Sequence, residues 1–185
     1  MTSTAAVPTT AGESGSSTVT KTGASKSEEL IAYLRSYVEL TQSLDTFKPH
    51  ILTIIEAADT LTIWIKGPRE NTDNGKLAST RMSDYLATLK NVLEWAASTK
   101  QSPKQKTNVL QKWISETNDK LKAQSNSTKD LSGRKADKFC YDVAEDVGRL
   151  EYEGKLILQM FDDRSQRSTE AAVKDDNVSF TSAKR

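Results

Sequence analysis

The sequence predicts an all-α fold, an antiparallel bundle of about five helices, and the clearest observation is a heptad pattern in its C-terminal third. Eight residues there follow one another at alternating spacings of four and three, which places them on one stripe of a long helix. Such a stripe must be covered by other helices. Shorter amphipathic patterns precede it, separated by polar or proline-containing segments, and predict the remaining helices. The eight residues are Ala136, Cys140, Val143, Val147, Leu150, Gly154, Ile157 and Phe161.

The foldable part of the 185-residue chain is expected at residues 27–164, because the two ends contribute few apolar side chains. Twelve of the first 25 residues are Ser or Thr, and no periodicity is visible among them. Ordering a residue costs about 1–2 kcal/mol, which so little burial cannot offset. Residues 1–26 are therefore predicted to form a disordered tail, and residues 165–185 a flexible one.

The first helix is expected to begin at Ser27, because Glu28 and Glu29 then favour the positive end of the helix dipole. Pro49 interrupts its pattern. Since a helix tolerates proline only in its first turn, a second helix is expected to begin near Lys48. The buried stripe of the first helix is predicted to be Leu30, Tyr33, Tyr37, Leu40, Leu44 and Phe47.

The second helix, expected to end at Lys66, is apolar over most of its circumference. A helix of this kind is either central in the fold or presents an interface. Its β-branched residues also leave a strand open as an alternative for residues 60–65. The inward stripe is Ile51, Ile54, Ala58, Leu61 and Ile65, and further apolar surface comes from Leu52, Ile55, Ile63 and Trp64.

Three more helices are expected after a polar loop at residues 69–75. The third should cover residues 77–99, and Pro103 at a first-turn position predicts the start of the fourth. A loop at 124–133 precedes the fifth helix, which should end near Arg164. Within it, Gly154 falls on the apolar stripe and predicts a close helix approach. The third helix should bury Met82, Leu86, Leu89, Leu93 and Ala96, flanked by Tyr85, Val92 and Trp95, and the fourth Val109, Leu110, Trp113, Ile114, Thr117 and Leu121.

The net charge of +1 hides an internal division. Residues 100–138 hold ten Lys/Arg against four Asp/Glu, whereas residues 141–163 hold two against seven. These segments are interpreted as neighbouring helices with complementary flanks. The alternative is a basic face for a polyanion and an acidic face for a basic partner.

The sequence predicts no enzymatic activity, no cofactor and no metal. His50, the sole histidine, has no obvious acid or nucleophile nearby, and Cys140 lies on the apolar stripe, where a thiol is unreactive. No Glu-x-x-His pair, phosphate-binding loop or serine-hydrolase motif is present. The N-terminus lacks the features of a secretory signal and no run of about 20 apolar residues could span a bilayer, so a cytoplasmic protein is expected.

The leading functional hypothesis is a non-enzymatic adaptor or scaffold that binds another protein or further copies of itself. Surplus apolar surface on the second helix nominates Ile55, Ile63 and Trp64, since Trp is enriched at interfaces. The alternative is a self-assembling structural subunit, such as a viral coat or nucleocapsid-type protein. In that case Lys104, Lys106 and Lys112 would make weak, non-specific contacts with the RNA backbone.

Two short segments are similar to the helical N-terminal domain of cyclase-associated actin regulators. They are Tyr33-Leu-Arg-Ser-Tyr37-Val-Glu-Leu40 and Ala96-Ala-Ser-Thr-Lys100-Gln-Ser-Pro103. The resemblance is confined to such fragments and includes no diagnostic motif, so it assigns no role to any residue of this chain.

Overall fold

The computed structural model describes residues 25–98 and 103–179, with the side chains of 103, 105, 106 and 163–179 outside the description. Within it the chain is all-α, as predicted, and has no strand. The tail predicted at residues 1–26 lies outside the described residues except for its last two positions. The elements are α1 (Lys26–Leu40), η1 (Gln42–Leu44), α2 (Lys48–Ile65), η2 (Pro68–Asn71), α3 (Asp73–Ala97), α4 (Pro103–Asn126) and α5 (Gly133–Ser179), where η marks a short 3-10 helix.

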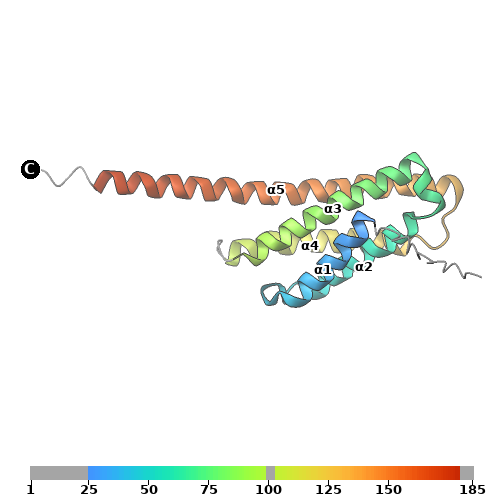
Figure 1. Cartoon of the computed structure of the whole chain (residues 1–185), viewed down its shortest axis with the longest axis horizontal. Coiled ribbons are helices and arrows are strands. Elements are labelled where there is room, and N and C mark those ends of the chain that lie inside the picture. The colour runs from blue at the N-terminus through green and yellow to red at the C-terminus, as the bar shows by residue number, and fades with distance from the viewer. Residues whose placement is uncertain (1–24, 99–102, 180–185) are drawn as a thin grey trace, which may run out of the picture.

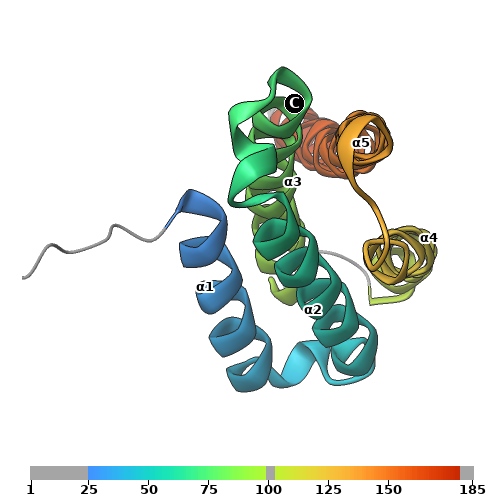
Figure 2. The ribbon, with the colours of Figure 1, turned by 90° about the vertical axis from the view of Figure 1, so that its right-hand side faces the viewer.

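Four helices, α2 to α5, form the centre of the bundle, and α1 packs on the edge between α2 and α3 (Figures 1 and 2). Trp113 on α4 lies beside Leu150 on α5, whereas Gln124 lies beside Asp146, so these consecutive helices run in opposite directions. The most extensive packing, however, joins α3 to α5.

The two helices α3 and α5 run in the same direction. Asn74 at the start of α3 donates to Asp137 at the start of α5, and farther along the two helices the rings of Trp95 and Phe161 are 4.7 Å apart. Parallel neighbours need a connection that returns to the starting end, and α4 with its turns provides it. The consecutive helices α4 and α5 are thus antiparallel, whereas α3 and α5, which are not consecutive, form a parallel pair at the centre of the bundle.

The heptad stripe of α5 is buried along its whole length, as predicted. Gly154 on this stripe meets α3 and α4 together. A Cβ atom at this position would lie 2.7 Å from Cγ2 of Thr88 and 2.9 Å from Cζ2 of Trp113. The close approach predicted for Gly154 is therefore confirmed.

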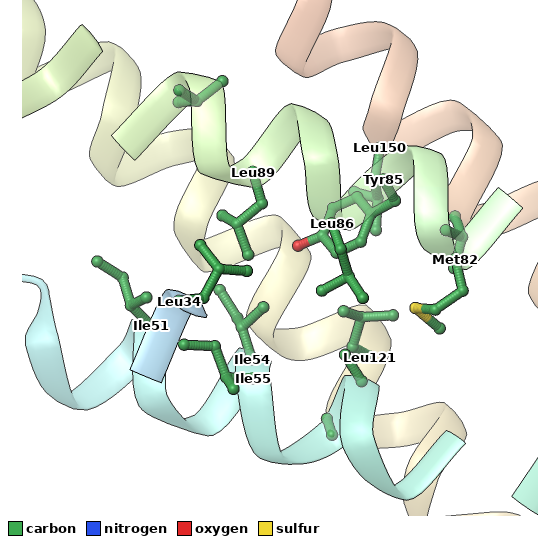
Figure 3. Packing of buried hydrophobic residues seen from close by; sticks show 14 of the residues in the cluster. Leu34, Ile51, Ile54, Ile55, Met82, Tyr85, Leu86, Leu89, Leu121 and Leu150 are labelled. Atoms are coloured by element: carbon green, nitrogen blue, oxygen red, sulfur yellow. The ribbon is translucent and has the colours of Figure 1, made fainter. Parts of the chain in front are cut away.

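Helix α2 is central, which accounts for most of its apolar surface. It is helical throughout residues 60–65, so the strand alternative is wrong. Its predicted inward stripe is buried, and Ile55 is buried as well because α1, α3 and α4 surround α2 on several sides. Figure 3 shows Ile51, Ile54 and Ile55 directed toward leucines of the neighbouring helices.

The buried stripe predicted for the first helix is only partly right, because Leu44 and Phe47 are buried and Leu30 and Tyr37 are half-buried, whereas the other two members are exposed. The helix begins at Lys26, where the Ser25 side chain caps it in a reciprocal arrangement with Glu28. It buries the neighbouring apolar stripe, Ile31, Leu34 and Val38, and leaves Tyr33 exposed and Leu40 83% exposed. Two apolar stripes lie one residue apart on α1, and the purely aliphatic one enters the core, whereas Tyr33 keeps its hydroxyl where it can donate to Glu94.

Helix α3 begins earlier than predicted, and the expected loop at 69–75 contains η2 and the first turn of α3. Thr72 caps α3 by accepting from the backbone N–H of Gly75. Gly75 is required because a Cβ atom there would overlap the carbonyl of Arg69. Tyr85 and Val92, expected at the flanks, are fully buried because α3 contacts α1, α2 and α5 at once.

Helix α5 continues past the predicted end at Arg164 to Ser179, so the segment 165–179 is helical, and residues 180–185 of the predicted tail lie outside the described residues. Its C-terminal part projects beyond the ends of the other helices (Figure 1). No proline or glycine occurs between Arg164 and Ser179. The loss of apolar residues after Arg164 therefore does not mark the end of the helix.

Candidate functional site

His50 and Cys140, the two residues weighed for catalysis in the sequence, are not brought together. His50 is exposed on the first turn of α2, whereas Cys140 is buried near the start of α5. These sites lie at opposite ends of α2, because Trp64 at its far end contacts Phe139, the neighbour of Cys140. Burial raises the pKa of the Cys140 thiol, which disfavours a reactive thiolate. Among the residues that the structure describes, no group of three or more His, Cys, Asp or Glu side chains is placed to hold a metal ion.

One small crevice, of about 280 Å³, opens where η2 meets the start of α5. Arg69 and Asp137 each make a hydrogen bond within the protein, whereas Nε of Arg69 is buried without a hydrogen-bond partner. The guanidinium of Arg69 donates to the Trp64 carbonyl oxygen at 2.9 Å, and the Asp137 carboxylate accepts from Asn74 at 2.8 Å. The lining residues are Pro68, Arg69, Thr72, Ser132, Gly133, Ala136 and Asp137.

Trp64 is half-buried and makes its contacts within the protein. Its ring meets Phe139 edge-on at 5.2 Å, and its Nε1–H donates to the backbone oxygen of Thr128 at 3.1 Å. The guanidinium of Arg69 lies 4.1 Å from the ring centre. Trp64 therefore joins the end of α2 to α5 and to the turn that precedes it.

The three residues nominated on α2 do not form one surface. Ile55 is in the core, Trp64 is half-buried under its own neighbours, and Ile63 is 63% exposed. The side chains at Thr60 and Glu56 near Ile63 are exposed and polar. Most of the apolar surface of α2 is thus buried by the helices around it, and Ile63 remains exposed.

The nominated lysines lie on α4. Lys104 and Lys112 are exposed, and the side chain of Lys106 lies outside the description. Glu116 and Asp119 are exposed on the same helix, so its solvent face carries both signs of charge.

The acidic segment of α5 is partly neutralised by its neighbours. Lys120 of α4 lies 3.2 Å from Asp146, an ion pair of the kind expected between complementary flanks. Glu151, which is buried, pairs with Lys155 and lies 3.8 Å from Arg81 of α3.

An apolar surface that the sequence reading missed runs along the outer face of α5. Its members, Tyr141, Tyr152, Leu156 and Met160, are each between 43% and 62% exposed. Tyr152 stands two positions from both Leu150 and Gly154, which places it about 200° around the helix from the buried stripe. We call these four residues the outer stripe of α5. Charged residues separate its members in the sequence, so the stripe shows no dense apolar periodicity that would predict it.

No helix within residues 25–98 and 103–179 combines the length and the apolar character that crossing a bilayer requires. Comparison with protein-family models, with curated proteins and with solved structures returned no match.

Proposed function

We propose that this chain is a non-enzymatic protein–protein interaction module, an adaptor or scaffold that acts in the cytoplasm, and that its contact surface is the outer stripe of α5. The observation that carries the proposal is the exposure of four large apolar side chains along one face of one helix. Single apolar residues are normal on a protein surface, but several on one face of one helix, as Tyr152, Leu156 and Met160 are, favour an interaction site.

The position of the outer stripe also favours this role. Tyr152, Leu156 and Met160 follow one another at i, i+4 and i+8, the spacing with which a helix presents anchors to a groove or to another helix. The opposite face of α5 is fixed to α3 by the buried stripe, so the exposed anchors are held on a rigid support.

The alternative of an RNA-coating structural subunit has less support. The lysines of α4 share their face with Glu116 and Asp119, and Lys120 is paired with Asp146. RNA binding that falls steeply with salt would favour this alternative.

The proposal is tested by comparing two variants of the full chain in affinity capture. Leu156→Lys/Met160→Lys places charge on the outer stripe, whereas Leu40→Lys places charge on an exposed apolar residue of α1, away from the outer stripe. We expect proteins bound by the wild type, a second copy included, to be lost from the first variant and kept by the second. If both variants retain the same bound proteins, the outer stripe is not the contact surface.

A further inference from the structure

We propose that a second copy of this chain occupies the outer stripe of α5, paired antiparallel about a two-fold axis near residue 150. Gly148 of each copy then faces Tyr152 of the other. This inference rests on the proposed function and names the partner for the same surface.

The charges beside the outer stripe suit a copy of the same helix. On the outer half of α5, Lys138, Arg149 and Lys155 are balanced by Asp142, Glu145 and Glu153. A balanced face gives no strong attraction to a highly basic or highly acidic partner. Complementarity must therefore come from the order of the charges along the helix.

That order is self-complementary in one register. An antiparallel pairing centred on residue 150 places Glu145 opposite Lys155 of the other copy. The same operation places Lys138 opposite Asp162, which is exposed and lies two residues beyond Met160, the last member of the stripe. Because the axis is two-fold, each contact occurs twice.

The alternative orientation is unfavourable. A parallel, in-register pair would set Glu145 beside Glu145 of the second copy. The present partner of Lys138 is Asp142, four positions away on the same helix, and such an exposed pair is weak enough to rearrange. Lys155 is exposed but pairs with the buried Glu151, so its contact with Glu145 of the second copy is made beside that pair.

Gly148 supplies a steric reason for the same register. Glycine weakens a helix, and unlike Gly154, Gly148 has no tight neighbour within its own chain that requires it. The nearest atoms to a Cβ placed there belong to Arg81, at 3.6 Å, which is ordinary contact. With no side chain at Gly148, the ring of Tyr152 from the second copy can approach this backbone beside the Arg81 side chain, whose Cδ and Nε lie 3.6 Å from the position that a Cβ would take.

The length of α5 fits this arrangement. In the proposed register, residues 163–167 of one copy lie along residues 133–137 of the other. Part of the segment that projects beyond the bundle in Figure 1 thereby gains a neighbour. An isolated helical segment of this length is marginal in water, so pairing gives it support.

One helix face offers fewer contacts than the 20–30 residues per side of a standard interface. We therefore expect a weak dimer with a Kd of roughly 10–100 μM. Sedimentation of the full chain from about 5 to about 500 μM brackets this range.

The register is tested by exchanging charges. Glu145→Lys and Lys155→Glu each create two like-charge contacts per dimer and should raise the Kd at least about tenfold. The double variant restores opposite charges and should return the Kd to near the wild-type value. Glu116→Lys, the same change on the exposed face of α4, is the matched control and should have no effect. Thermal unfolding of each variant at low concentration checks that the fold is retained.

A wild-type chain that stays monomeric at every concentration overturns the inference. A dimer whose Kd is unchanged in both single variants, or not restored in the double variant, overturns it as well. If the chain is monomeric and Leu156→Lys/Met160→Lys still abolishes capture of a different protein, the proposed function stands and the second copy is the wrong partner. If neither dimer nor captured protein depends on the outer stripe, both fail.

Discussion

Two glycines on α5, six residues apart, allow a paired test of how the helix packs. Gly154→Ala adds a methyl group that would lie 2.7 Å from Thr88 and 2.9 Å from Trp113. Neither neighbour can move easily, because both are buried and the Trp113 indole is tied to the Leu150 carbonyl oxygen at 3.1 Å. Gly148→Ala adds the same methyl group beside Arg81 alone, at 3.6 Å.

The two substitutions share one effect and differ in the other. Both gain helix propensity of up to about 1 kcal/mol. At Gly154 the gain is opposed by overpacking, which typically costs about 1–3 kcal/mol. We therefore expect Gly148→Ala to raise the free energy of unfolding by about 0.5–1 kcal/mol and Gly154→Ala to fall about 1–3 kcal/mol below it.

Urea unfolding followed by circular dichroism and by tryptophan fluorescence measures this difference. The experiment should be done at a protein concentration well below any dimer Kd, because association adds to apparent stability. Equal slopes against urea show that the two variants unfold from equally compact states. If Gly154→Ala is as stable as Gly148→Ala, the close junction of α3, α4 and α5 does not exist as described.

Three other predictions follow from the contacts. Trp64→Ala should lower the free energy of unfolding by about 2–3 kcal/mol, because it removes packing against α5 and one hydrogen bond. Ile63→Ala, at an exposed neighbouring position, should change it by less than about 0.5 kcal/mol. Similar losses for the two variants in urea unfolding would contradict this prediction. The hydrogen bond to the Glu94 carboxylate raises the pKa of Tyr33 to about 12. The stabilisation by this contact therefore holds below pH 10 and is lost as the pH rises toward 12. Glu94→Gln should lower the pKa of Tyr33 toward 10 in an ultraviolet titration, and an unchanged titration curve would refute the assignment. Burial raises the pKa of Cys140, so thiol reagents should label it only on unfolding, and rapid labelling of the folded chain would be inconsistent with its position.

The helices themselves could be predicted because their signals are local. Pro49 and Pro103, each at a first-turn position, indicate where α2 and α4 begin, and spacings of three and four define the buried stripes of α2 and α5. Gly154 was predicted to mark a close approach for the same reason, since its position on the stripe is visible in the sequence.

The choice between two apolar faces could not be predicted, because it depends on tertiary neighbours. On α1 the stripe containing Tyr33 and the stripe containing Leu34 both have helical spacing, and only the placement of α2 and α3 decides which is covered. The apolar residues outside the predicted stripe of α2 could likewise have faced either the core or an interface, and Ile55 is buried in the core.

The outer stripe of α5 required the structure for a further reason. Tyr152 and Leu156 look like isolated apolar residues among charges until the heptad face is assigned to the interior. Once that face is known to be buried, Tyr152 and Leu156 can be placed together on the exposed face of α5.

The parallel pairing of α3 with α5 has a consequence for how the chain acquires its structure. Asn74 and Asp137 are 63 residues apart, whereas Lys48 and Glu39, which link α1 to α2, are nine apart. Closing the longer loop costs about 2 kcal/mol more entropy, so the α1–α2 hairpin should form early and α5 should dock last. During synthesis, the side of α3 that receives α5 stays uncovered until α5 has emerged from the ribosome, which leaves apolar surface that a chaperone can bind.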